Sequence, residues 1–136
     1  MSNPYQRFHE QAADDPRVTA DVFALIHPEG HVTFEQGTAY GVATVVDPHH
    51  GAISGFMLYD ATGRAVMRGY GADVALAMPE KYAPNPLAER IIPMLGGPVQ
   101  PWRGHVALFA WNGVDEARGL NAEQQERIRA VAGEQP

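Results

Sequence analysis

The sequence predicts an α+β fold in a single domain, with an antiparallel sheet of four to six strands and two or three peripheral helices. The first observation is a β-hairpin over residues 51–71, where two apolar runs flank the turn Asp60-Ala61-Thr62-Gly63. Asp60 can bond the turn backbone, and Gly63 supplies the positive φ of a type I turn with a bulge. Further alternating segments separated by Pro and Gly predict more strands, and two segments that begin with capping residues predict helices.

The length of 136 residues suits one domain with an adequate core. Residues 1–16 are predicted to be an N-terminal arm or a short helix, and residues 133–136 a flexible tail. The compact part of the domain is expected to lie between these two ends.

A second hairpin is predicted near the N-terminal end. Residues 21–27 and 31–36 have strand composition and flank the turn Pro28-Glu29-Gly30. With a loop of three residues, His27 and His31 should lie opposite each other across the mouth of this hairpin.

Three further segments are assigned by alternation. Residues 37–46 are predicted to be a strand, because β-branched and aromatic side chains recur there at every second position. These residues are Thr38, Tyr40, Val42, Thr44 and Val46. Residues 72–78 are either a short strand or an irregular buried strip, and residues 105–111 are a strand.

Two helices are predicted in the C-terminal half. The first begins at Asn85 as N-cap, and Pro93 is expected to break or kink it near Ile92. The second runs from Asn121, which opens a capping box, to about Val131.

Composition narrows the possible functions. The chain has no cysteine, which removes disulfides, thiolate nucleophiles and cysteine-ligated metals. The formal net charge of −6 is scattered, so we expect no nucleic-acid partner and no membrane partner. No apolar run approaches the ~20 residues that span a bilayer, and the N-terminus lacks signal-peptide order, so we expect a cytoplasmic protein.

Catalytic motifs are absent from the sequence. Ser54 has no strand-to-helix nucleophile elbow around it, and no glycine pattern matches a phosphate-binding loop. We therefore expect no enzymatic activity and no cofactor. A nucleotide pocket at a homodimer interface stays open, because an edge strand such as residues 65–70 can pair between chains.

The histidines supply the alternative chemistry. His27 and His31 can converge, and the turn that holds His49 and His50 can approach them, which would give a site for a divalent metal such as zinc, nickel or iron. Neighbouring His49 and His50 point opposite ways in extended backbone, so at most one of them joins. The competing interpretation is that all four are solvated turn histidines.

Aromatic residues in Pro-rich loops suggest a different role. Tyr82, Trp102 and Trp111 lie in or beside such loops, and Arg103 is adjacent. Exposed Trp, Tyr and Arg are typical of an interaction surface. The alternative is that Trp102 folds back and caps the core.

Three pieces of the last third of the chain have a familiar layout: Asn85-Pro86-Leu87-Ala88 opening a helix, Gly104-His105-Val106-Ala107-Leu108 as a strand, and Gly119-Leu120-Asn121-Ala122-Glu123-Gln124 opening a terminal helix. This layout resembles a family of small uncharacterised domains of actinobacterial and phage genomes. The resemblance implies a phage or mobile-element setting and no known activity. We therefore expect a non-catalytic acidic binding module that contacts a host protein, the alternative being a metal- or small-ligand-binding protein, with or without enzymatic activity.

Overall fold

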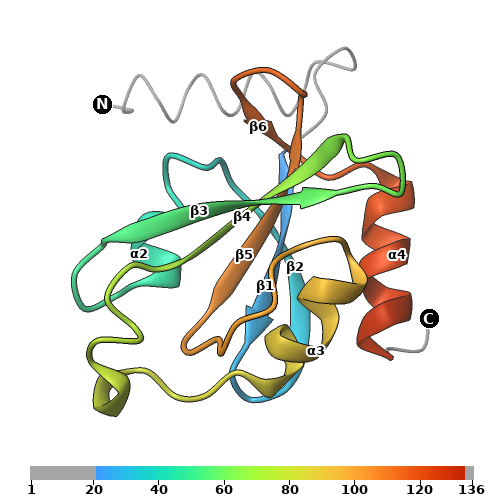
Figure 1. The fold of residues 1–136 in the computed structure, drawn as a ribbon. Helices are drawn as coiled ribbons and strands as arrows, with labels where there is room; N and C mark the ends of the chain where they lie inside the picture. Colours follow the sequence, from blue (N-terminus) through green and yellow to red (C-terminus); the bar gives the residue numbers. More distant parts are fainter. Residues whose placement is uncertain (1–20, 134–136) are drawn as a thin grey trace, which may run out of the picture.

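The computed structural model describes residues 21–133 as an open antiparallel sheet with helices packed around it (Figure 1). The strands are β1 (Val22–His27), β2 (His31–Gln36), β3 (Ile53–Tyr59), β4 (Ala65–Ala72), β5 (Val106–Trp111) and β6 (Ala117–Arg118). The helices are α2 (Ala43–Val46), the 3₁₀ helix η1 (Pro79–Lys81), α3 (Pro86–Met94) and α4 (Ala122–Ala132). The predicted α+β class is confirmed. The arm predicted over residues 1–16 and positions 134–136 of the predicted tail lie outside the described residues.

Strand β5 lies in the middle of the sheet, between two hairpins. The strand order is β2-β1-β5-β4-β3, with β6 paired to β5. The β1–β2 hairpin has the predicted register, with His27 opposite His31. The β3–β4 turn is also as predicted, because Gly63 has a φ of 83° and Asp60 accepts hydrogen bonds from two turn amides. Strand β4 is interior, so the prediction that residues 65–70 form an edge strand is wrong.

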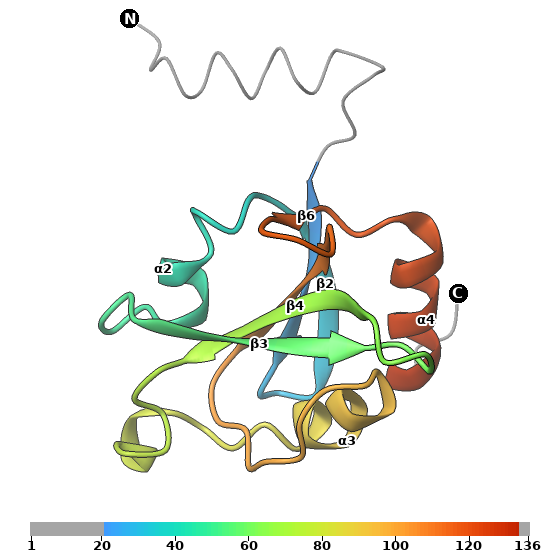
Figure 2. The same ribbon diagram turned by 45° about the horizontal axis from the view of Figure 1, so that its top comes forward.

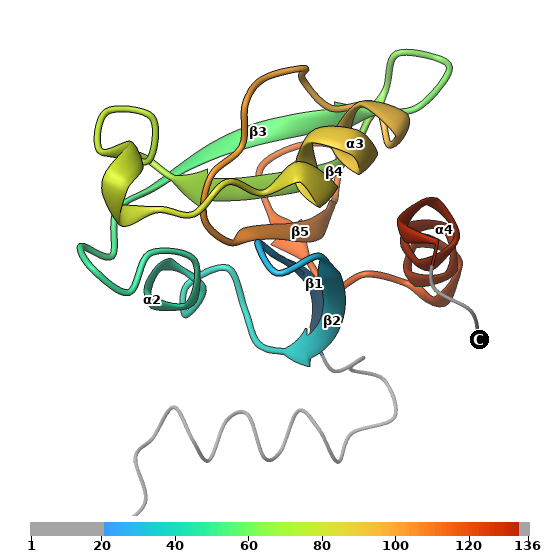
Figure 3. The same ribbon diagram turned by 90° about the horizontal axis from the view of Figure 1, so that it is seen from below.

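Side chains on the two faces of the sheet build two cores. One packs against α3 and α4 and includes Ala24, Ile26, Leu58, Met67, Ile91, Ile92, Val106, Leu108 and Ile128. The other lies beside α2 and consists of Phe23, Leu25, Val42, Val46, Ala107 and Phe109. Figures 2 and 3 show α2 and α4 on opposite sides of the sheet.

Residues 37–46 do not form the predicted strand. The amide of Gly41 bonds the carbonyl of Thr38 at 3.1 Å in a turn, and one turn of helix α2 follows. Val42 and Val46 lie four residues apart on the same side of this turn, and each is only 1% exposed. Residues four apart share a face in a strand, where every second side chain points the same way, and also in a helix, where every fourth does. The spacing therefore did not distinguish the two elements, and the β-branched composition favoured the wrong one, the strand.

Two other segments differ in detail from the sequence prediction. Ala72 is the last residue of β4, and residues 73–78 are irregular instead of a strand. Only Ala75 among them is buried, so the segment is irregular but is not the buried strip of the second alternative. Helix α3 continues through Pro93 for one more residue instead of breaking near Ile92. Pro93 stands in the last turn, where the helix is about to end and little hydrogen bonding is lost. The end is closed by Gly96 and Gly97, whose amides bond the carbonyls of Pro93 and Ile92.

Helix α4 begins as predicted. The Asn121 side chain accepts from the Gln124 amide at 2.8 Å, and the Gln124 side chain accepts from the Asn121 amide at 3.0 Å. Gly133, with a φ of 79°, ends the helix. Between residues 21 and 133 no helix is both long and apolar enough to cross a membrane.

Candidate metal site

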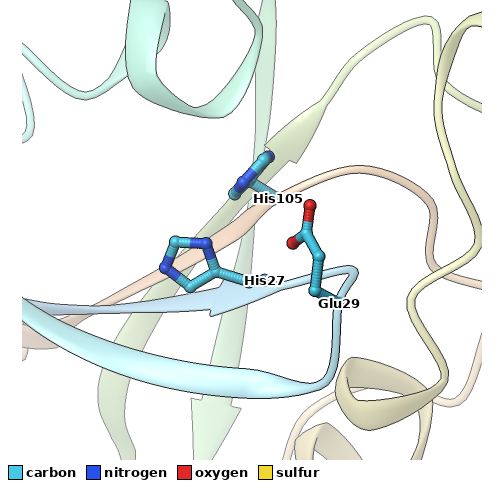
Figure 4. A group of neighbouring side chains, drawn as sticks. All are labelled: His27, Glu29 and His105. Atoms are coloured by element: carbon cyan, nitrogen blue, oxygen red, sulfur yellow. The ribbon is translucent and has the colours of Figure 1, made fainter.

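Two histidines and a glutamate converge where β1 ends and β5 begins. His27 is the last residue of β1, Glu29 lies in the β1–β2 turn, and His105 directly precedes β5. One potential ligand atom from each residue lies within 4.8 Å of the other two. Figure 4 shows the two rings and the carboxylate directed toward a common space. Two imidazoles and one carboxylate are a donor set that suits transition metals.

The pairing of β1 with β5 explains why these histidines meet. The strands are antiparallel, and the last pair of their ladder is Ile26 with Val106. His27 follows Ile26 and His105 precedes Val106, so the two histidines are neighbours just beyond that pair. Both side chains project to the face opposite Ile26 and Val106, because neighbouring strand residues alternate. Their ring centroids are 5.0 Å apart at an interplanar angle of 77°.

A hydrogen-bonded chain fixes the ring of His27 from its other side. The Thr33 hydroxyl donates to a carboxylate oxygen of Glu35 at 2.7 Å, and His27 Nε2 lies 2.8 Å from the same Thr33 oxygen. Because the hydroxyl proton is directed to Glu35, the Thr33 oxygen accepts from Nε2–H of His27. The lone pair of the neutral ring is then on Nδ1, the nitrogen left for a ligand. A carboxylate behind a histidine in this way is typical of the outer shell of metal sites.

The surroundings also keep His27 uncharged. Burial lowers the pKa of His27 below its ordinary value of 6.5. Positive charge on His31 and His105 lowers this pKa further, while the carboxylates of Glu29 and Glu35 oppose the shift. His27 is therefore mainly neutral at pH 7, the form that ligates metals.

Asn85 connects the backbone on both sides of the histidine pair. Its side-chain amide donates to the carbonyl of Ile26 at 3.1 Å and to the carbonyl of Gly104 at 2.8 Å. Its side-chain oxygen accepts from the amide of Ala88 at 3.0 Å, which confirms the predicted N-cap of α3. Asn85 is completely buried.

Of the four histidines that the sequence suggested as metal ligands, two lie side by side. His27 and His31 are together, with ring centroids 4.2 Å apart and nearly parallel planes. His31 is not a member of the group of three found within residues 21–133, and neither are His49 and His50, which lie in the turn after α2. Glu29 and His105 complete the group with His27 instead. Sequence reasoning missed His105 because its proximity to His27 depends on strand pairing between distant segments. The only signal in the sequence was that His105 begins a predicted strand.

Tyr82 is not the exposed aromatic that the sequence suggested. It is 4% exposed, and its hydroxyl donates to a carboxylate oxygen of buried Asp47 at 2.7 Å. Burial, together with the hydrogen bond to Asp47 and its negative charge, raises the pKa of Tyr82 to about 12. Burial alone would raise the pKa of Asp47, but the hydrogen bonds from Tyr82 and from the amides of Ala52, His50 and His49 outweigh it and hold the pKa below 3.8.

Trp102 is also buried, at 6% exposed, so the predicted exposure of this residue is wrong and the alternative, that it caps the core, is observed. Its ring packs against Phe56, with centroids 4.6 Å apart. Glycines in β4 make the space: a Cβ at Gly69 would lie 2.1 Å from the Phe56 ring, and one at Gly71 would lie 3.2 Å from Trp102. The Pro-rich loop that contains Trp102 therefore folds onto the sheet.

The other two residues of the predicted interaction surface lie apart. Arg103 is half-buried and donates to the backbone carbonyls of Tyr82 and Pro79, so it holds the loop together. Trp111 borders a groove of about 650 Å³, beside Arg68 and Tyr70. Binding of a partner protein through these residues stays a prediction, and two of the four residues that were to carry it, Tyr82 and Trp102, are buried.

Three cavities found among residues 21–133 lie away from the histidine group. They have volumes of about 170, 290 and 650 Å³ and are lined by residues other than His27, Glu29 and His105. Glu29 is exposed and both histidines are partly exposed. The group is therefore open to solvent and to small ions.

No protein-family model, curated protein or solved structure matches the chain. The resemblance to a domain family of actinobacterial and phage genomes, and the host-protein partner it suggested, stay predictions.

Proposed function

We propose that this protein binds one divalent transition-metal ion through His27, Glu29 and His105. The observation that carries the proposal is the convergence of three potential ligand atoms within 4.8 Å of one another. The chain from Glu35 through Thr33 to His27 supports it, because it orients the ring and leaves Nδ1 as the free donor. This is the second of the two functions that the sequence suggested, with Glu29 and His105 in place of His31 and of His49 or His50.

The donor set indicates which metals fit. Imidazole nitrogens suit zinc, nickel, copper and iron, whereas calcium and magnesium prefer oxygen ligands. Three protein ligands leave at least one coordination position for water or a small molecule, as in open zinc sites and in iron sites with two histidines and a carboxylate. We therefore expect zinc-like ions to bind and magnesium to be rejected.

Binding needs only a small rearrangement. Ligands about 2.1 Å from a tetrahedral zinc ion lie about 3.4 Å from one another, closer than the 4.8 Å limit within which these atoms lie. Glu29 can approach by a rotamer change, since it is exposed in a turn. His27 is held by Thr33, so His105 and Glu29 are expected to close on it.

The test is a titration of untagged protein with Co(II), followed by visible absorption, with native mass spectrometry to count bound zinc. We expect one ion per chain. His105→Gln should weaken binding by about 100-fold or more, since the loss of a ligand should cost at least as much as the loss of an outer-shell partner.

The matched control is His50→Gln, which removes an exposed histidine of the turn after α2. We expect it to bind the metal as the wild type does. Wild-type protein without stoichiometric metal, or equal losses in the two variants, would contradict the proposal.

A further inference from the structure

We infer that Asn85 is the positioning residue of this site: its side-chain amide ties the backbone before His27 to the backbone before His105 and so sets the distance between the two histidines. The inference rests on the proposed metal site for its functional meaning. The geometric part, that Asn85 holds the histidine pair, can be tested without metal.

The contacts of Asn85 are complete and specific. One side-chain amide group donates to two carbonyls, those of Ile26 and Gly104, at 3.1 and 2.8 Å. Each carbonyl belongs to the residue directly before one of the histidines. The side-chain oxygen is used by the Ala88 amide, and the backbone amide of Asn85 donates to the carbonyl of Trp102. A buried amide with every group bonded has one orientation available.

The position of Asn85 explains why such a link is needed. The ladder between β1 and β5 has the pairs Ala24 with Leu108, Leu25 with Ala107 and Ile26 with Val106, and His27 and His105 lie one step beyond the last pair. At this open end Asn85 supplies the cross-strand connection in place of a further ladder pair.

Helix α3 anchors the link to the core. Asn85 is the N-cap of α3, and the helix buries Leu87, Ala88, Ile91 and Ile92 against the sheet. The packing of the helix therefore fixes Asn85. Asn85 in turn fixes the carbonyls of Ile26 and Gly104 through its hydrogen bonds. An outer-shell group held in this way is expected to limit the motion of the ligands it serves.

The chain offers a matched control in Asn121. This asparagine is the N-cap of α4 and also accepts a hydrogen bond from the amide three residues later. It is exposed and has no hydrogen bond to the histidine segments. Serine is as good an N-cap as asparagine, so Asn85→Ser and Asn121→Ser both keep a cap while only Asn85→Ser removes the link.

The first experiment compares zinc affinity in the full chain by competition with a chromophoric chelator. We expect Asn85→Ser to bind zinc about 10-fold or more weakly, the range for outer-shell partners, and to change the Co(II) absorption spectrum. Asn121→Ser should stay within two-fold of the wild type. Equal affinity in Asn85→Ser and wild type would overturn the inference and leave the metal site standing.

The second experiment uses metal-free protein and NMR. Cross-relaxation between the ring protons of His27 and His105, whose centroids are 5.0 Å apart, should be present in the wild type and in Asn121→Ser and lost in Asn85→Ser. Should Asn85→Ser not fold, the isosteric Asn85→Asp keeps the volume and the cap acceptor but has no amide donors, and the same loss is expected. Retention of the cross-peak would overturn the inference. A wild type that binds no metal yet shows this pattern would refute only the proposed function.

Discussion

Asp47 and Asn85 are each completely buried, and each holds the surrounding backbone through several hydrogen bonds. Asp47 accepts hydrogen bonds from the amides of His49, His50 and Ala52 and so shapes the turn after α2. Asn85 does the same where α3, β1 and β5 meet. Burial of such groups is tolerable only because all their bonds are made.

The hydrogen bond between Tyr82 and Asp47 predicts a pH dependence. The pKa of Tyr82 is about 12 in the folded protein against an ordinary value of 10.0. Its ionisation therefore favours the unfolded chain, and its contribution to stability is complete below pH 10 and is lost as the pH rises through 12. We expect the free energy of unfolding, measured in urea, to fall more steeply over this interval in the wild type than in Tyr82→Phe.

Tyr59→Phe is the matched control, since Tyr59 is 47% exposed. In Tyr59→Phe the free energy of unfolding should fall with pH between pH 10 and 12 as steeply as in the wild type. A Tyr82→Phe variant with the same slope as the wild type would mean that Tyr82 is not held neutral in the fold.

At the scale of elements, the end of α3 and strand β3 depend on each other. The Tyr59 amide donates to the carbonyl of Gly96 at 3.0 Å. Gly96 has a φ of 88°, and a Cβ placed on it would lie 1.9 Å from the carbonyl oxygen of Tyr59. The backbone of the helix end therefore rests directly on the edge strand, and only glycine satisfies both conditions.

Gly96→Ala tests this contact, with Gly63→Ala as control. Gly63 has a similar φ of 83°, but a Cβ there would meet nothing within 4 Å. We expect Gly63→Ala to cost about 1–2 kcal/mol for the left-handed backbone. Gly96→Ala should cost about 3 kcal/mol or more, because the clash with Tyr59 is added. Equal losses in urea unfolding would show that the helix end does not press on β3.

Elements set by local chemistry could be read from the sequence. Asp60 and Gly63 identify the β3–β4 turn, and Asn85 and Asn121 identify the helix starts, because turns and caps use side chains close in sequence. Helix α2 could not be found in this way, since its valines fit two periods and only packing against the second core chooses between them.

In the candidate site, too, the features that depend on residues close in sequence were predictable, and those that depend on distant segments were not. The approach of His27 and His31 follows from a turn of three residues and was predicted. The approach of His105 depends on the pairing of segments almost 80 residues apart in the sequence. The burial of Trp102 depends on space over Gly71, which a single sequence does not reveal.

For the whole molecule, the proposed site joins two separate parts of the chain. His27 and Glu29 belong to the first hairpin, and His105 belongs to the central strand. An ion bound to all three should therefore stabilise the folded domain and not merely a turn.

Zinc should accordingly raise the free energy of unfolding by about 2.7 kcal/mol at 100 times its dissociation constant. Urea unfolding with zinc and then with excess EDTA measures the effect, which the chelator should reverse. At the same zinc concentration His105→Gln, with its affinity about 100-fold lower, should gain about 0.4 kcal/mol or less. A gain of the same size in His105→Gln would mean that the metal binds elsewhere.

The central position of β5 also has a consequence for synthesis. Each of the two hairpins joins strands that are close in sequence, but β5 alone links them, and it is completed only at Trp111. While the ribosome is still extending the chain, β1 and β4 each expose a row of unpaired backbone groups that the finished sheet covers. The nascent protein therefore passes through an interval in which these two strands can pair wrongly, with each other or with another chain, until β5 emerges and takes its place between them.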